Sequence, residues 1–273
     1  MLYAAGQVLQ TLPRGKPIKG VASLDNLLYV LRDGLSSEQL EVYHKDSFQL
    51  QRKLTVSGLG SAADIVACGH YYCAYISDGT NYVVHRLALP SFAAKVWPVY
   101  KYKPSCLSVT HLHSVLVTSS NARLIKEYTT DGELLREVKL RSNIPCHAVL
   151  SSSGQFTVCH GEQFDHSFTH LVCEVGFDGK AVKSFGGFGG SGRQNMYAPA
   201  HLAVDRRDLN IFIADLGNDR VLLLSPSLTF LREVVSTKQL RGWPARLCLD
   251  VDKNRLYVAV NDLEGGQVAA VSI

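Results

Sequence analysis

Pro199-Ala-His-Leu-Ala-Val204 is the stretch that decides the fold, because variants of it recur along the chain. The other copies lead into similar small or β-branched apolar runs and begin at Pro17, Ala62, Pro104, Pro145 and Pro244. Successive copies are 45, 42, 41, 54 and 45 residues apart. A period of about 40 to 50 residues is typical of the blades of a β-propeller.

The same series of segments follows each copy. A polar turn leads to an apolar run such as residues 211–214, and a second turn leads to an alternating strand such as residues 220–224. A hairpin signal such as Asp131-Gly132 then precedes a last strand. We therefore predict four strands per repeat, no amphipathic helix, and an all-β, six-bladed propeller that forms one domain over residues 1–273.

The last repeat lacks a fourth strand, and the N-terminus offers a replacement. The expected blades cover residues 17–61, 62–103, 104–144, 145–198, 199–243 and, for the last blade, 244–273 together with 1–16. Residues 3–12 parallel residues 128–138, which include the fourth strand of the third blade. A ring closed in this way leaves no unpaired edge, so we expect residues 7–12 to pair with residues 267–273.

Composition restricts the class of protein further. Hydrophobic residues make up 46% of the chain and the mean hydropathy is +0.03, which suits a folded core, while no apolar run is long enough to cross a membrane. The seven cysteines are scattered and odd in number. This pattern favours reduced thiols and a cytoplasmic, intracellular protein. The net charge of +4 alone does not indicate a nucleic-acid binder.

The fifth repeat resembles the NHL repeat. It has a glycine-rich approach over residues 185–192, then Pro199, a small apolar run ending in Asp205, a strand ending in Asp215, and Asn218-Asp-Arg220. The third repeat keeps only Asn121-Ala-Arg123 of this pattern. In such a repeat we expect Asn218 to adopt the left-handed turn conformation and Arg220 to pair with Asp215.

Function in a propeller belongs to the loops, and one set of loops is basic. The loops between blades and those between the second and third strands of a blade share one face, called here the top face. We assign to the blade-to-blade loops Arg14, Lys16, Lys19, Lys101, Lys103, Arg141, Arg193, Arg241 and Arg246, against the single acid Asp64. Acids in the within-blade loops dilute this charge: Asp33, Glu38, Asp78, Glu162, Asp165, Asp219, Asp262 and Glu264.

Aromatic side chains accompany the cations and leave two kinds of partner open. They are Tyr100, Tyr102, Tyr197, Trp243 and, in the long loop of the fourth blade, Phe164. Cations beside aromatic faces suit single-stranded or stem-loop RNA, and several NHL propellers of the TRIM-NHL proteins bind RNA on this face. The same residues suit a protein partner, which we expect in first place. The resemblance implies the target-binding domain of a TRIM-NHL type ubiquitin ligase, whose RING domain would lie elsewhere.

Two groups of residues are candidates for a metal site. Repeat symmetry places the third residue of each copy around one end of the channel: Lys19, Asp64, Cys106, His147, His201 and Arg246. Propeller lactonases hold calcium in this region, but the ring offers only one carboxylate for it. NHL-like amidating lyases hold zinc there, and Asp64, His147 and His201 would be its ligands. We expect the two cations to oppose a metal. The second group is the loop over residues 160–170, with three histidines and two acids.

The sequence thus predicts a non-catalytic recognition module without a cofactor, a membrane contact or a small-molecule substrate. Its expected partner is a protein bound at the top face. RNA binding is the first alternative, and a metal-dependent lyase or lactonase in the central channel is the second.

Overall fold

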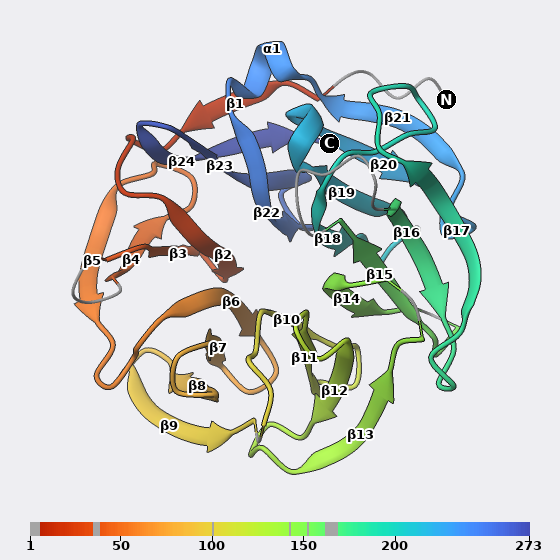
Figure 1. Cartoon of the computed structure of the whole chain (residues 1–273). Coiled ribbons are helices and arrows are strands. Elements are labelled where there is room, and N and C mark those ends of the chain that lie inside the picture. The colour runs from red at the N-terminus through yellow and green to blue at the C-terminus, as the bar shows by residue number, and fades with distance from the viewer. Residues whose placement is uncertain (1–5, 35–38, 100, 142, 152, 162–168) are drawn as a thin grey trace.

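The computed structural model describes residues 6–34, 39–99, 101–141, 143–151, 153–161 and 169–273. These residues form six four-stranded antiparallel sheets around a central channel, which confirms the predicted six-bladed propeller (Figure 1). The described helical structure, which we did not predict, is limited to the 3₁₀ turn η1 (Leu216–Asn218) and the single-turn helix α1 (Thr237–Leu240). Both lie in loops of the top face, so the blades themselves are all β.

The strands of each blade follow one another from the channel outward. Blades 1 and 2 consist of β2 Ile18–Leu24, β3 Leu27–Arg32, β4 Gln39–His44, β5 Leu50–Thr55, β6 Ala62–Cys68, β7 Cys73–Asp78, β8 Val83–Ala88 and β9 Ala93–Pro98. Blades 3 and 4 consist of β10 Cys106–Val109, β11 Val115–Ser119, β12 Leu124–Tyr128, β13 Leu134–Lys139, β14 Pro145–Leu150, β15 Phe156–His160, β16 Thr169–Val175 and β17 Ala181–Phe188. Blades 5 and 6 consist of β18 Pro199–Val204, β19 Ile211–Asp215, β20 Arg220–Leu224, β21 Phe230–Val235, β22 Trp243–Asp250, β23 Arg255–Asp262, β24 Gly265–Ser272 and β1 Val8–Thr11.

The core lies between the blades. The second strands are buried on both faces because each is covered by a neighbouring blade on either side, and every residue of β7, β11 and β19 is buried. Outer strands such as β5 are largely exposed and lie at the perimeter (Figure 1). Each of the six hydrophobic clusters in the described chain joins residues of two adjacent blades. The ring therefore depends on contacts between neighbours, as in other repeat proteins.

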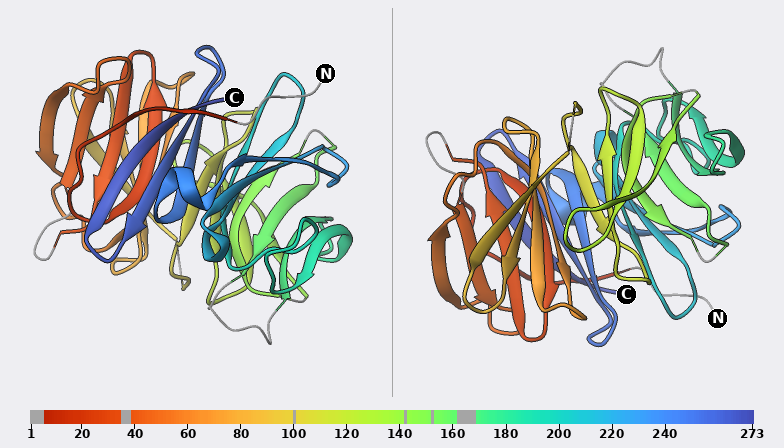
Figure 2. Two further views of the ribbon diagram at one scale, coloured as in Figure 1. Left: turned by 90° about the horizontal axis from the view of Figure 1, so that it is seen from above. Right: turned by 90° about the horizontal axis from the view of Figure 1, so that it is seen from below.

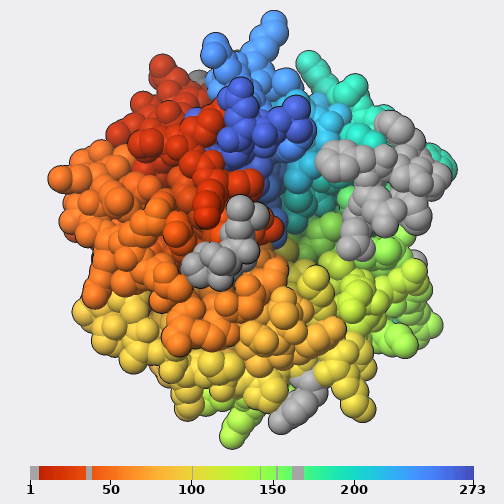
Figure 3. All heavy atoms as spheres, turned by 60° about the vertical axis from the view of Figure 1, so that its left-hand side comes forward, coloured from red at the N-terminus to blue at the C-terminus, as the bar shows by residue number. Residues whose placement is uncertain are grey.

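The N-terminal strand closes the ring as predicted. Strand β1 pairs antiparallel with β24, with Val8 opposite Val271 and Thr11 opposite Ala269. Gly6 donates its N–H to the carbonyl of Val234 in blade 5, and Gly15 forms a bridge with Gly266. The N-terminal segment consequently lies against the C-terminal one, as the space-filling view also shows (Figure 3).

The connecting loops gather on two opposite faces of the ring (Figure 2). The top face has the loops that enter each blade and those that join its second and third strands, and the bottom face has the remaining turns. All seven cysteines are free thiols. Among the described residues, no helix has the length and apolar character that a membrane crossing requires.

Candidate functional site

A β-bulge near the start of the innermost strand decides which side chains enter the channel. In blades 2, 4, 5 and 6 the bulged residue is the second of the repeated phrase, so the third points inward, as at His147 and His201. In blade 1 the bulge falls on Lys19 instead, and Gly20 takes the channel position. Lys19 turns outward and pairs with Asp33 at 3.0 Å, which corrects the predicted place of Lys19 in the ring.

The ring brings the predicted metal candidates together. Ligand atoms of Asp64, His147 and His201, all buried, lie within 4.8 Å of one another. His201 Nε2 lies 3.6 Å from Asp64 Oδ2, although blades 5 and 2 are on opposite sides of the channel. The rings of His147 and His201 stack with centroids 3.9 Å apart. The cluster therefore crosses the channel near its top end.

Arg246 completes this cluster from blade 6. Its Nε lies 3.3 Å from Asp64 Oδ1, and its terminal nitrogen donates to the carbonyl of Ala63 at 2.8 Å. The side chain of Arg246 passes blade 1 to reach blade 2, and Gly20 of blade 1, which has no side chain, leaves space for it. Arg246 thus lies inside the channel, where repeat symmetry placed it, and not on the loop surface to which we also assigned it.

The cluster residues bind the backbone of the neighbouring blade. Asp64 Oδ2 accepts the N–H of Leu107, and the Nδ1 atoms of His147 and His201 accept the N–H groups of Leu202 and Leu247. With Nδ1 an acceptor, each neutral ring has its proton on Nε2. The ring of His147 then donates to the carbonyl of Leu107 at 3.0 Å. These side chains therefore fasten adjacent blades to one another.

Burial keeps the two histidines neutral, whereas the neighbours of Asp64 keep its carboxylate charged. Desolvation lowers the pKa of His201 and, more strongly, that of His147. Desolvation would raise the pKa of Asp64, but the hydrogen bond from His201 and the charge of Arg246 hold it below its ordinary value. The negative charge of Asp64 is thereby compensated within the protein.

Metal binding would have to dismantle this network. A zinc ligand needs a free lone pair on the imidazole, but both Nδ1 lone pairs already accept backbone N–H groups. Each Nε2 has a proton that is directed at an oxygen of Leu107 or Asp64. A cation, Arg246, also occupies the remaining side of the carboxylate. The donor set in this arrangement does not fit zinc or calcium.

A second set of polar contacts holds the top loops. In blades 1 to 5 the last residue of the second strand bonds the loop that leads into its own blade: Arg32 to Lys16, Asp78 to Gly60 and Ser61, Ser119 to Lys103, His160 to Ile144, and Asp215 to Tyr197. The scaffold thus fixes the path of the loops from which the basic side chains project.

The NHL-like signature of blade 5 belongs to this set. Arg220 Nε lies 2.8 Å from Asp215 Oδ2, as expected, and its terminal nitrogens donate to carbonyls of the glycine-rich loop. Asn218 lies in η1 and bonds Asp215 and the carbonyl of Gly190. The left-handed residue is Asp219, at φ 52°, so the expectation for Asn218 was wrong by one position.

Two other blades show how local the signature is. In blade 2, Asn81 bonds Asp78 and the carbonyl of Gly58, which repeats the arrangement of Asn218; we did not predict this contact, although the shared spacing Asp-x-x-Asn signals it in the sequence. In blade 3, Arg123 is the left-handed turn residue, at φ 55°, and is exposed. It therefore does not repeat the role of Arg220, despite the matching Asn-x-Arg.

The basic residues of the top face divide into engaged and free side chains. Arg14 pairs with Asp262 and Glu264, and Arg141 donates to the carbonyl of Asp178 at the rim. Exposed cations without an acidic partner among the described residues are Lys16, Lys101, Lys103, Arg193 and Arg241. Of the acids in the described within-blade loops, Asp33, Asp262 and Glu264 pair with basic residues, and Asp78 is buried. Asp219 is neither paired with a basic residue nor buried.

The aromatic residues are less available than the sequence suggested. Lys126 Nζ covers the ring of Tyr102 at 4.5 Å, and Tyr197 packs against His170 with centroids 5.0 Å apart. Trp243, the first residue of β22, is 38% exposed. Tyr100 and Phe164, together with Glu38, Glu162 and Asp165, lie outside the described residues, as does most of the candidate metal loop after Gly161.

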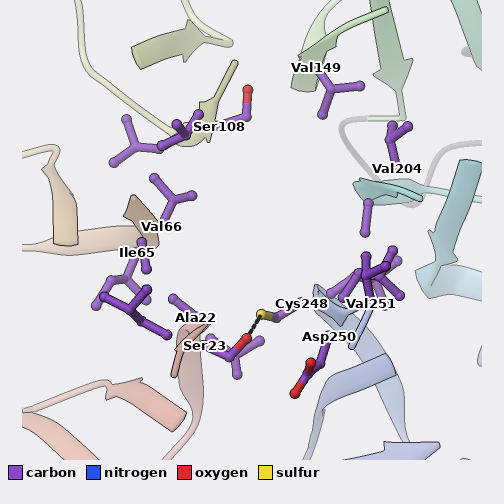
Figure 4. Close-up of a pocket in the computed structure, with 18 of the residues that line it drawn as sticks. Ala22, Ser23, Ile65, Val66, Ser108, Val149, Val204, Cys248, Asp250 and Val251 are labelled. Atoms are coloured by element: carbon purple, nitrogen blue, oxygen red, sulfur yellow. Dashed lines mark hydrogen bonds between the residues drawn. The ribbon is translucent and has the colours of Figure 1, made fainter. Parts of the chain in front are cut away.

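Two cavities open on the bottom face, and their lining residues were not indicated by the sequence. One is the channel itself, about 590 Å³, whose wall includes Val66, Val149 and Val204 (Figure 4). The other is a groove of about 690 Å³ along blades 4 and 5. No motif could have signalled them, because turns from several blades form their rims.

Comparisons with known proteins show the fold. No model of a protein family and no curated protein sequence matches the chain. Two solved propellers of unknown function are similar in structure: one from Bacteroides caccae (TM-score 0.67, 13% identity, 88% of this chain and 84% of that chain) and one from Bacteroides thetaiotaomicron (TM-score 0.70, 13% identity, 95% and 70%). Virginiamycin B lyase from Staphylococcus aureus is also similar (TM-score 0.66, 9% identity, 98% and 99%).

Proposed function

We propose that this protein is a non-catalytic recognition module that binds an acidic segment of a partner protein at its top face. The observation that supports this proposal is the division of the cations into engaged and free side chains. The acids of the neighbouring loops pair with Arg14 and Lys19, while Lys16, Lys101, Lys103, Arg193 and Arg241 extend into solvent. The described part of the top face therefore has an excess of positive charge that attracts an acidic partner.

The fastened scaffold supports the same proposal. Arg32 donates to the carbonyl of Lys16 and Ser119 donates to that of Lys103, so the loops that contain Lys16, Lys101 and Lys103 are held in place before any partner arrives. A rigid array of charges loses little conformational entropy on binding. By the NHL resemblance of blade 5, the proposal extends to a target-binding domain of a TRIM-NHL type ubiquitin ligase, in which the propeller selects the protein to be modified.

RNA is less well suited to the aromatic residues of this face. Single-stranded RNA gains affinity by stacking bases on open aromatic faces. Lys126 covers Tyr102, and His170 and the backbone around Gly217 pack on Tyr197, so Trp243 is the most open of the described candidates. One exposed tryptophan beside cations suits a protein contact, in which such residues dominate the binding energy.

A metal-dependent lyase in the channel is the remaining alternative, and the similarity in fold to virginiamycin B lyase is what favours it. The engaged nitrogens of His147 and His201 argue against it. Thermal unfolding with and without zinc tests this alternative.

The decisive experiment compares a poly-glutamate peptide with single-stranded RNA as probes, at low and at physiological salt. We expect the peptide to bind, and the variant Lys101→Glu/Lys103→Glu/Arg241→Glu to bind at least about tenfold more weakly at low salt. The matched control, Lys95→Glu/Lys180→Glu/Lys253→Glu, changes the net charge equally but leaves the top face intact.

Three outcomes separate the candidates. Peptide binding that the top-face variant loses and the control keeps supports the proposal. RNA binding with a sequence preference that the top-face variant loses would establish RNA as the partner instead. Equal weakening by both variants would mean that only net charge matters, and it would overturn the proposal.

A further inference from the structure

The groove on the bottom face is open, has an apolar stretch of wall and has a cation at each end. Its wall includes Val149, Leu150, Val204, Leu209 and Ile211. Its volume of about 690 Å³ lies in the range of small-molecule sites, about 300 to 1,000 Å³. At its outer end, Lys183 donates to the carbonyl of Pro226 and pairs with Glu174, so the charge at that end is compensated.

The inner end has a cation that pairs with no described residue. Arg206 lines both the groove and the channel, which also share Val109, Val149 and Val204. Figure 4 shows Val149 and Val204 close together on the channel wall. Arg206 is exposed and forms no ion pair or hydrogen bond with the described residues, whereas its neighbour Arg207 is bound to Asp205. A guanidinium at the edge of an apolar groove is suited to bind a carboxylate.

Three histidines lie near this end. His111 lines the groove, and His113, two residues on, stacks on His70 with ring centroids 4.1 Å apart and planes 3° apart. Tyr71 meets both of these rings edge-on. Partial desolvation and then the electrostatic effects of His70, Arg206 and His111 lower the pKa of His113. No carboxylate of the described chain is among the groups that shift this pKa.

Two of the three acids that line the adjoining channel mouth have partners. Asp250 pairs with Lys45 at 2.7 Å, and Asp25 accepts the hydroxyl of Tyr72. The third, Asp252, forms no ion pair with the described residues, but it lines the channel and not the groove. Among the described residues that line the groove, Arg206 is therefore the cation without an acidic partner, since Lys183 pairs with Glu174.

We infer that the groove is a binding site for a small amphipathic anion, a carboxylate with an unbranched apolar chain. The carboxylate meets Arg206 and His111 at the inner end. The chain lies along Val204, Leu209 and Ile211 toward Pro226. This site is on the face opposite the proposed protein-binding surface, so the inference does not depend on the proposed function.

Calorimetric titration with decanoate, below its micellar concentration, tests the inference. We expect decanoate to bind, decyltrimethylammonium not to bind, and affinity to fall about fourfold for each methylene group removed from the chain. Arg206→Gln should weaken binding at least about tenfold, because it removes a charge-assisted hydrogen bond. The matched control Arg207→Gln changes the adjacent arginine and should alter affinity less than about twofold.

A second pair of variants locates the chain. Ser227→Trp, at the exposed rim of the groove, should block decanoate, whereas Val66→Phe, which fills only the channel, should not. Bound decanoate should also raise the pKa of His113 in an NMR titration, a shift that a merely structural Arg206 would not produce. Equal binding of decanoate and decyltrimethylammonium, no binding of decanoate, or unchanged affinity in Arg206→Gln would overturn the inference.

Discussion

The two ends of the central channel are built from the same repeats, yet they differ in how their polar groups are used. At the top end Asp64, His147 and His201 are buried, and each bonds the backbone of another blade. At the bottom end Arg206 and His111 lie at open cavities and bond none of the described residues. Polar groups with partners stabilise the ring, and those without partners are left for recognition. The cluster that most resembles an active site in the sequence is thus the more structural of the two.

Removing Asp64 should have the largest effect. Asp64→Ala leaves the N–H of Leu107 and the guanidinium of Arg246 buried without their acceptor. Breaking a buried pair from one side costs about 3 to 5 kcal/mol of the free energy of unfolding. Urea denaturation measures this loss. Asp252→Ala at the opposite end should cost less than about 0.5 kcal/mol, and equal losses would remove the distinction between the two ends.

Acid should destabilise the ring through its buried histidines. Burial lowers the pKa of His160, at the end of β15, to about 4, whereas the unfolded chain has a histidine pKa of about 6.5. Below pH 6.5 the unfolded state therefore binds the extra proton, and the stabilisation present above that pH is lost as pH falls toward 4. The loss from His160 alone is about 3 kcal/mol.

Chemical denaturation between pH 7 and 4 measures this loss, with His160→Gln as the variant that should flatten the curve. A slope that His160→Gln leaves unchanged would contradict this prediction.

Zinc should have the smallest effect. Because the ring nitrogens of His147 and His201 are already hydrogen-bonded, we expect stoichiometric zinc to leave the melting temperature unchanged, to within about 1 °C. Thermal unfolding with and without the metal measures this. An increase in melting temperature that His147→Gln and His201→Gln both abolish would contradict this prediction. It would show that the hydrogen bonds of these histidines break when a metal binds, and it would support the lyase alternative.

The arrangement of the blades was predictable because its signal is local. Apolar runs and turns recur at each blade, so the sequence predicts the number of strands, their order and the closing strand. The direction in which individual side chains point was less predictable. A bulge inserts one extra residue into a strand, and in blade 1 that residue is Lys19. In blade 1 the strand begins one residue after the proline, whereas in blade 4 it begins at the proline itself. A shift of one residue reverses the side to which a strand residue points, so Gly20 replaced Lys19 in the channel.

The sequence by itself determined a closed six-bladed ring, a basic top face and a set of polar residues at one end of the channel. Only the tertiary structure decided which of these residues are engaged. Arg246 meets Asp64 and Arg14 meets Asp262 across blade boundaries, whereas Lys101 and Arg206 have no such partners in the described chain. The physical reason is that strand pattern is set by neighbours along the chain, but the partners of Arg246 and Arg14 come from another blade. That choice depends on how the blades pack.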